Sequence, residues 1–395
     1  MIDSIEVFTG TGGLAMGMQM AGCDHRAVIE WDKDSCENLR LNIKKGYAPM
    51  RDWNVIESDV RLVDYGQFGN NIQLVAGGPP CQPFSLGGKH QAYNDKRDMF
   101  PEAIRAVHEL QPKAFVFENV KGLLRKSFAS YFNYIYLRLT FPEILRRDGE
   151  DWTDHLARLE REYTGGHYTG LQYNVVYRLL NAANYGVPQS RHRVVIVGFR
   201  SDLGIRWSFP EGEFSRDALL HAQWVTGEYW DEHKVAKKYR PKPSSTDLRK
   251  VEQLKAEYTF APMPTQRWRT VRDAIGDLPD PQSKKALIIP NHEFRDGARS
   301  YPGHTGSVLD EPSKTIKAGA HGVPGGENTV VLDDGTVRYY TVRESARIQT
   351  FPDDYLFHGS WTESMRQIGN AVPVKLAHMV GLSVVGELER RDING

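Results

Sequence analysis

Short apolar segments alternate with helical segments through the first third of this chain, and this alternation limits the fold more than any other feature. Apolar segments of strand length cover residues 5–8, 27–29, 74–76 and 114–117, and a further strand-and-turn unit ends at Asp59 and Val60. Residues 14–21 repeat apolar side chains with a helical period. A later run, Val194–Val197, is apolar throughout, as a strand covered on both faces requires. The pattern predicts an α/β fold built on a doubly wound, mostly parallel sheet.

Composition places the chain among globular proteins of a reducing compartment. Of its 395 residues, 40% are apolar and 25% are charged, which suffices for a substantial core. Three cysteines cannot form a disulfide framework. The first residues carry acids where a signal peptide carries positive charge, and no apolar run reaches membrane-spanning length. We therefore expect a cytoplasmic protein without a membrane segment.

A glycine-rich turn, Phe8-Thr9-Gly10-Thr11-Gly12-Gly13, follows the first strand. Such a turn lets a ligand lie against main-chain N–H groups at a helix N-terminus. The second strand ends at Glu30 and Trp31, where an acid can bind both ribose hydroxyls and an indole can stack on adenine. Asp59 is placed to bond an exocyclic amino group. Together these residues predict a pocket for an adenosine-bearing cofactor, although a glycine turn alone is often only a tight corner and this spacing does not specify the cofactor.

A single cysteine follows the fourth strand, in the sequence Gly77-Gly78-Pro79-Pro80-Cys81-Gln82-Pro83-Phe84-Ser85. The glycines permit an abrupt turn, and the prolines remove backbone freedom on both sides of Cys81. One interpretation is that this rigid loop fixes the thiol as a nucleophile at the end of a buried strand. The alternative is a small buried hydrophobe, as most lone cysteines are. The loop alone favours neither.

Two further polar groups accompany later strands. Glu118 and Asn119 follow the fifth strand, and Arg191 and Arg193 enter the apolar strand at 194–197 on one face. Each has an ordinary structural alternative, as a turn or capping carboxylate and as edge arginines paired with surface acids.

Taken in order, these segments resemble the DNA cytosine-5 methyltransferase family of the bacterial or phage restriction–modification type. The glycine turn is similar to its cofactor motif, Pro79–Ser85 to its nucleophile motif, and Glu118-Asn119-Val120 to its acid motif. Gln189-x-Arg191-x-Arg193 is similar to its paired-arginine motif. Residues 341–352 and 367–373 resemble its last two motifs, so the likeness extends from residue 5 almost to the end of the chain.

The resemblance implies that Cys81 adds to carbon 6 of cytosine, because carbon 5 is not nucleophilic until a nucleophile has been added to the ring. A free thiol has a pKa of roughly 8.5, so the site must favour the thiolate. Glu118 would hold or protonate the ring nitrogen, through a raised pKa or by hydrogen bonding. Arg191 and Arg193 would anchor the cysteine loop, the base and its phosphate. The activated ring takes the methyl group of S-adenosylmethionine and expels Cys81.

The same resemblance implies a Rossmann-like S-adenosylmethionine-dependent methyltransferase fold and the residues of two binding sites. The cofactor residues are Phe8, Gly10, Thr11, Gly12, Gly13, Leu14, Glu30, Trp31, Asp59, Val60, Pro80, Asn370 and Val372. The substrate residues beside the catalytic ones are Gln82, Ser85, Asn119 and Gln189. No metal is expected.

The expected substrate is a specific short sequence of double-stranded DNA. A stacked cytosine cannot reach a thiol in a pocket, so the base must be flipped out of the duplex. Residues 85–91, with two glycines and a lysine, predict a lid that closes over the DNA. A restriction endonuclease that acts on the same site is an expected partner, and the enzyme is expected to be a monomer.

The chain is predicted to contain a catalytic and cofactor-binding domain at residues 1–203, a target recognition domain at 204–338, and a segment at 339–395 that completes the catalytic domain. The recognition domain should consist of short strands and loops. Its residues 234–272 carry eleven Lys or Arg and only three Asp or Glu, interleaved with prolines, which favours a loop-rich, DNA-facing surface over a charged helix. A helix at 363–389 should return to the large domain. Helices at 128–139 and 154–163 form an insertion that covers the sheet or contacts DNA or a partner.

Three other functions deserve comparison. A tRNA cytosine-5 methyltransferase shares the motifs, but it can do without so long a recognition region. A catalytically inert DNA-binding relative is disfavoured because Cys81, Glu118, Arg191 and Arg193 are all present. A nicotinamide-dependent oxidoreductase is disfavoured by the glycine spacing.

Overall fold

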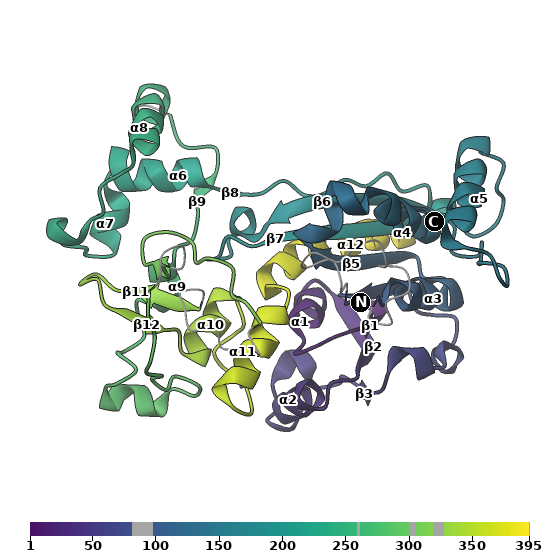
Figure 1. Ribbon diagram of the computed structural model, residues 1–395, viewed down its shortest axis with the longest axis horizontal. Helices are drawn as coiled ribbons and strands as arrows, with labels where there is room; N and C mark the ends of the chain where they lie inside the picture. The colour runs from purple at the N-terminus through teal and green to yellow at the C-terminus, as the bar shows by residue number, and fades with distance from the viewer. Residues whose placement is uncertain (81–97, 259–260, 301–304, 319–327, 395) are drawn as a thin grey trace. The chain divides into compact units, whose positions relative to one another are not determined.

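The computed structural model describes residues 1–395 apart from 81–97, 259–260, 301–304, 319–327 and 395 (Figure 1). The chain divides into two compact units, and each is described by itself. The first unit comprises Met1–Leu180, His192–Pro210 and Ala377–Gly395, and the second comprises Asn181–Arg191 and Glu211–Leu376. This division rests on compactness, and the functional domains with boundaries at residues 204 and 339 remain a proposal.

A seven-stranded sheet forms the centre of the first unit, in the order β3-β2-β1-β4-β5-β7-β6. The strands are β1 (Ile2–Val7), β2 (Cys23–Glu30), β3 (Val55–Glu57), β4 (Leu74–Gly77), β5 (Ala114–Val120), β6 (Tyr173–Asn181) and β7 (His192–Arg200). Strands β1 to β5 pair in parallel, whereas β7 pairs with β5 in the antiparallel sense. The predicted α/β fold with a mostly parallel sheet is confirmed.

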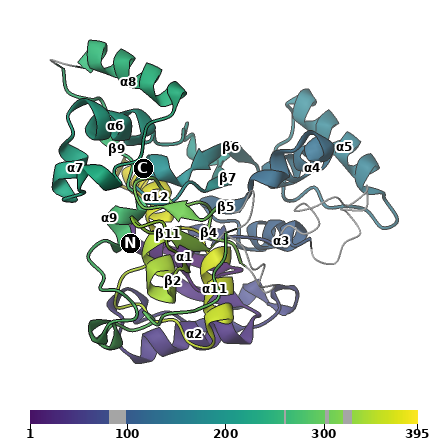
Figure 2. The ribbon, with the colours of Figure 1, turned by 60° about the vertical axis from the view of Figure 1, so that its left-hand side comes forward.

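Helices cover both faces of this sheet (Figures 1 and 2). The long helices of this unit are α1 (Gly13–Met20), α2 (Lys33–Lys44), α3 (Phe100–Leu110), α4 (Ala129–Thr140), α5 (Trp152–Gly165) and α12 (Val374–Asn394), whose first turn belongs to the second unit. Shorter turns of helix are η1 (Ala48–Met50), η2 (Val60–Leu62), η3 (Tyr65–Phe68), η5 (Lys121–Leu124), η6 (Lys126–Phe128) and η8 (Ser201–Leu203). Ile5 and Val7 of β1 share one apolar core with α3 and α4. Glu6, which lies between them in the chain, faces α1 instead. This alternation is the period of two that a strand imposes.

The second unit is built mostly from short strands and short helices. Its sheets are β8 (Phe214–Ser215) with β9 (Gln266–Arg267), and β10 (Ser307–Val308), β11 (Thr329–Val331) and β12 (Val337–Tyr339). Its helices include α6 (Arg216–Leu220), α7 (Glu228–Glu232), α8 (Ser245–Tyr258), α9 (Val271–Ile275), α10 (Val342–Ile348) and α11 (Trp361–Asn370). Shorter turns are η7 (Ala182–Tyr185), η9 (His221–Val225), η10 (Lys237–Tyr239) and η11 (Lys284–Ile288).

Two helical predictions were wrong. The basic stretch at 234–272 was expected to lack a charged helix, yet α8 carries Arg249, Lys250 and Lys255. The prolines flank this helix and do not interrupt it, and buried Val251 and Leu254 anchor one face.

The single helix expected at 363–389 is instead α11 and α12. The break precedes Pro373, which lacks a main-chain N–H and disfavours helical geometry at Val372.

One stretch of the described residues, Trp361–Arg391, is long and apolar enough to cross a membrane by length and composition. Of its most apolar window, 67% is buried inside the protein. Because a buried core helix passes the same test, this stretch is weak evidence for a membrane span.

Candidate active site

The parallel strands bring four predicted motifs to one edge of the sheet. The register aligns Ile29 with Val7, Val7 with Gly77, and Gly77 with Phe117 across β2, β1, β4 and β5. The residues that follow this row therefore leave the sheet at its carboxyl edge, where ligands of doubly wound folds bind. They are the glycine turn, Glu30, Gly78 and Glu118.

The glycine turn has the backbone geometry that its sequence requires. Phe8, Gly10 and Gly12 have φ angles of 59°, 56° and 82°, in the left-handed region that favours glycine. A Cβ at Gly12 would lie 3.0 Å from Leu39 and 3.2 Å from Trp53, so this position also lacks room for a side chain. A Cβ at Gly10 would meet nothing within 4 Å. The turn is therefore packed below Gly12 and open at Gly10.

Glu30 is tied to this turn by hydrogen bonds. Its carboxylate accepts from the main-chain N–H groups of Gly10 at 2.7 Å, Trp31 at 3.0 Å and Asp32 at 2.8 Å. Burial raises the pKa of Glu30, and the three hydrogen bonds oppose that shift. The indole of Trp31 is 71% exposed and stands beside this carboxylate in the chain. This is the pair that was predicted to bind ribose and adenine.

The remaining predicted cofactor residues of the first unit lie around the same edge. Thr11 is buried and accepts a hydrogen bond from Asn38 at 2.9 Å. Asp59 is ion-paired with Arg61, which lowers the pKa of the carboxyl. Gly13, Leu14 and Val60 are buried.

Sequence reasoning missed two residues that support this pocket. Asn38 holds Thr11, and Trp53 packs against Gly12 while its indole N–H donates to Gln19 at 3.0 Å. No local pattern marks either residue, because each acts across twenty or more positions of the chain.

The acid motif lies beside the residues that precede Cys81. The Glu118 carboxylate pairs with the Arg193 guanidinium at 2.6 Å, and both side chains are nearly buried. A Cβ at Gly78 would lie 3.4 Å from the same carboxylate. The Asn119 amide donates to the main-chain carbonyl of Pro79 at 2.9 Å. Burial lowers the pKa of Arg193, and the charge of Glu118 opposes that shift.

Several predicted residues lie outside the described part of the chain. Cys81, Gln82, Ser85 and the predicted lid at 85–91 are among them. Pro80, the residue before Cys81, is described and exposed, and its carbonyl accepts a hydrogen bond from the Met99 N–H at 3.2 Å. The described neighbours of Cys81 in the chain are therefore fixed by Asn119 and Met99.

Within the second unit, Arg191 and Gln189 have buried side chains that bind the protein itself. The Arg191 guanidinium donates to the main-chain carbonyls of Ile316 at 2.9 Å, Gly369 at 2.7 Å and Ala371 at 3.0 Å, and its residue exposure is 0%. Gln189 donates to Gln349 at 2.9 Å and accepts from the Ile316 N–H at 3.0 Å. These contacts hold both side chains within the second unit, and the predicted roles of the two residues toward the substrate stay predictions.

Asn370 and Val372 flank the carbonyls that Arg191 holds. Asn370 is exposed at the end of α11, and Val372 is buried in the segment before α12. Arg191 therefore fixes the main chain from which the predicted cofactor contact of Asn370 would come.

Two other features of the described residues have the composition or shape of a ligand site. Glu232, His233 and Asp273 come close together, but the Arg267 guanidinium already pairs with both acids, so the group is explained as an ion-pair network.

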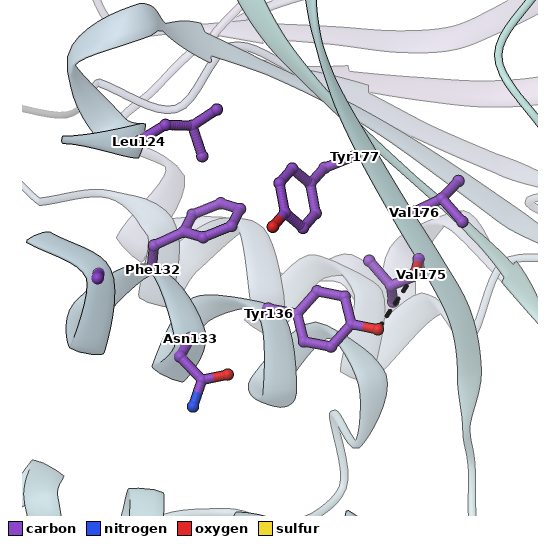
Figure 3. Close-up of a pocket in the computed structure, with 8 residues that line it drawn as sticks. Leu124, Phe132, Asn133, Tyr136, Val175, Val176 and Tyr177 are labelled. Atoms are coloured by element: carbon purple, nitrogen blue, oxygen red, sulfur yellow. Dashed lines mark hydrogen bonds between the residues drawn. The ribbon is translucent and has the colours of Figure 1, made fainter. Parts of the chain in front are cut away.

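A pocket of about 750 Å³ lies between α4 and β6 (Figure 3). Its lining residues are Leu124, Ala129, Phe132, Asn133, Tyr136, Val175, Val176 and Tyr177. The Asn133 amide donates to Glu160 at 2.9 Å and the Tyr136 hydroxyl to Val175 at 3.4 Å, so both are used within the protein.

Comparison with known proteins identifies the family to which this chain belongs. The family model for C-5 cytosine-specific DNA methylases matches residues 2–141 and 167–385. The chain belongs to this family. It is a DNA (cytosine-5-)-methyltransferase, an enzyme that methylates carbon 5 of cytosine in DNA.

Curated relatives cover nearly the whole chain. It is 33% identical over 394 residues to the type II methyltransferase M.Eco47II of Escherichia coli, and the alignment covers 98% of this chain and 79% of that protein. It is 31% identical over 398 residues to the type II methyltransferase M.NgoMIV of Neisseria gonorrhoeae, with 98% and 99% covered.

Solved structures share the fold. A DNMT2 structure from Spodoptera frugiperda has a TM-score of 0.56 at 15% identity and covers 98% of this chain and all of that one. The Dnmt2 methyltransferase of S. pombe has a TM-score of 0.55 at 16% identity, with 98% and 99% covered.

Proposed function

We propose that this enzyme transfers the methyl group of S-adenosylmethionine to a flipped-out cytosine in a short sequence of double-stranded DNA, through a covalent adduct with Cys81. The observation that carries the proposal is the placement of Glu118. Its carboxylate is paired with Arg193 and lies against Gly78, three residues before Cys81. In this proposal the target ring would be bound beside Cys81, Glu118 and Arg193.

The described residues suit the cofactor. Gly10 leaves open space at the turn, the Glu30 carboxylate is held in place by three N–H groups, and Trp31 presents an exposed indole. Glu30 would bind the ribose hydroxyls and Trp31 the adenine, with the N-terminus of α1 beside the polar end. When bound, S-adenosylmethionine supplies an electrophilic methyl group.

The chain's own residues perform the remaining chemistry. Addition of the Cys81 thiolate to carbon 6 pushes the ring electrons toward the pyrimidine nitrogen, where Glu118 holds or supplies the proton. Arg193 keeps Glu118 oriented. After methylation, loss of the proton at carbon 5 lets the Cys81–carbon bond break, which restores the aromatic ring and the thiolate.

The target recognition function is assigned to residues 204–338. The lysines and arginines of residues 234–272, including the basic side chains of α8, would bind the phosphates of the DNA backbone. Similarity to type II methyltransferases favours a restriction–modification system with a cognate endonuclease. A monomer acting in the cytoplasm accords with one chain that carries every motif.

The test is incubation with genomic DNA and labelled S-adenosylmethionine, followed by bisulfite mapping, with Cys81→Ser beside the wild type. Methylation confined to one short sequence and lost in the variant is expected. Undiminished labelling by Cys81→Ser would contradict the covalent mechanism. Transfer of the labelled methyl group to tRNA but not to duplex DNA would instead support the tRNA methyltransferase alternative. Absence of methyl transfer to either nucleic acid would support a catalytically inert relative.

A further inference from the structure

A buried tyrosine is linked to the residue before Cys81 through two short steps. The Tyr131 hydroxyl, on α4, donates a hydrogen bond to one carboxylate oxygen of Asp98. The other oxygen accepts from the Phe100 N–H at 3.2 Å, at the start of α3. Met99 lies between Asp98 and Phe100 in the chain, and its N–H donates to the Pro80 carbonyl at 3.2 Å. Tyr131 thus restrains the segment from Asp98 to Phe100, whose Met99 N–H is bonded to Pro80.

The link between Tyr131 and Asp98 is buried. Asp98 is 9% and Tyr131 5% exposed. A hydrogen bond to a carboxylate is stronger than one between neutral groups, and shielding from water strengthens it further. Loss of the hydroxyl would leave a buried carboxylate oxygen without this donor, at a cost that the local chain can reduce only by moving.

Tyr131 is in turn packed by the segment that the family model leaves unmatched. That segment is 142–166, and it contains α5. Trp152, at the start of α5, packs edge-on against Tyr131 with ring centroids 5.9 Å apart, and against Tyr134 at 5.7 Å. His155 of α5 is bonded to the Tyr134 hydroxyl at 2.9 Å and to the Ile144 carbonyl at 2.9 Å. The insertion therefore holds the face of α4 from which Tyr131 extends.

We propose that Tyr131 is a positioning residue for the nucleophile: through Asp98 and Met99 it fixes the carbonyl of Pro80, the residue to which Cys81 is joined in the chain. The inference rests on the proposed role of Cys81. It gives the unmatched segment 142–166 a function, because Trp152 of α5 packs against Tyr131. Small displacements of a reacting atom slow a reaction strongly, so loss of the hydroxyl should slow covalent addition by about tenfold.

The experiment measures the rate of covalent adduct formation on a duplex that carries 5-fluorocytosine at the mapped target position. Tyr131→Phe should form the adduct about tenfold more slowly than the wild type, with unchanged affinity for S-adenosylmethionine. The matched control is Tyr136→Phe, which removes a hydroxyl from the same helix that bonds the Val175 carbonyl instead. The control should react at the wild-type rate.

A double-mutant cycle with Asp98 separates positioning from general destabilisation. Asp98→Asn keeps an acceptor for Tyr131 and should retain most of the rate. Asp98→Ala should be as slow as Tyr131→Phe, and the double variant no slower than either, because both remove one link. If Tyr131→Phe does not fold, the Asp98→Ala and Asp98→Asn pair carries the test alone.

The outcomes distinguish two failures. A wild-type enzyme that forms no adduct contradicts the proposed function itself. A wild-type enzyme that forms the adduct, together with a Tyr131→Phe variant of equal rate, overturns only the positioning role. Additive losses in the cycle, or an equal slowing in Tyr136→Phe, overturn it as well.

Discussion

Glu118 on β5 and Arg193 on β7 form an ion pair diagonally across two antiparallel strands, since Arg193 lies opposite Val120 in the register. Each is nearly buried, so each helps to compensate the charge of the other. The pair explains how a carboxylate is kept at one position beside the nucleophile motif without a surrounding water shell.

The first prediction concerns Glu118→Gln, which keeps the shape of the side chain and removes its charge and its acidic proton. We expect turnover to fall by about 10²–10⁴-fold, the usual contribution of a general acid or base. Binding of S-adenosylmethionine, measured by calorimetry, should be unchanged because Glu30 and the glycine turn are intact. A variant with near-normal turnover would contradict the role of Glu118.

The second prediction concerns Glu6, an acid of β1 that faces α1 and is 1% exposed. Burial raises the pKa of Glu6 well above its ordinary value of 4.5, and the main-chain N–H of Ala15 opposes this in part. At pH values between the ordinary pKa of Glu6 in the unfolded chain and its higher pKa in the folded protein, the folded protein binds more protons than the unfolded chain. Glu6 therefore lowers the free energy of unfolding as the pH rises above about 4.5.

Glu6→Gln should therefore be more stable than the wild type at pH 8, and its advantage should shrink toward pH 5. Chemical denaturation at both pH values measures the difference. An advantage that grows as the pH falls would show that Glu6 is charged and paired in the folded protein.

At the scale of elements, the site depends on how each strand ends. The glycine turn, Glu30 and the Gly-Gly-Pro-Pro segment follow parallel neighbours, and the register places them in one row. Their order along the chain indicated the fold because each chemical motif follows an apolar strand. The unmatched helix α5 had no such motif, and its link to Tyr131 through Trp152 arises only from packing.

The third prediction compares two glycines of the same turn. Gly12→Ala should lower the free energy of unfolding by about 1–3 kcal/mol, because its φ is left-handed and its Cβ would press on Leu39 and Trp53. Gly10→Ala should cost less, since its φ is also left-handed but its Cβ enters open space. Thermal denaturation ranks the two; an equal loss would mean that backbone strain alone accounts for both.

At the scale of the molecule, long-range contacts hold the second unit together. Arg191 binds carbonyls at residues 316, 369 and 371, which are more than a hundred positions further along the chain. A guanidinium satisfies several carbonyls at once because its five donors lie in a fixed plane.

The fourth prediction is that Arg191→Met destabilises the protein by about 2–4 kcal/mol, since several buried carbonyls lose a charged donor. Arg200→Met is the matched control, because Arg200 lies at the end of β7 and its partner Asp202 is exposed; it should cost under about 1 kcal/mol. Guanidinium denaturation measures both. Equal losses would mean that the carbonyl contacts contribute little.

The sequence alone was enough for the sheet, the motif order and the family, because strand hydrophobicity and the turns that carry chemistry are local patterns. It misplaced the helical limits in residues 234–272 and 363–389, where flanking or interrupting prolines had to be weighed against helical period. Only the tertiary structure revealed that Arg191 binds main-chain carbonyls and that Gln189 binds Gln349 and the Ile316 N–H. It alone showed that Asn38 and Trp53 support the glycine turn and that Tyr131 is linked to Pro80. These contacts join residues far apart in the chain, and a side chain's partner at such separation is decided by packing, which leaves no periodic trace in the sequence.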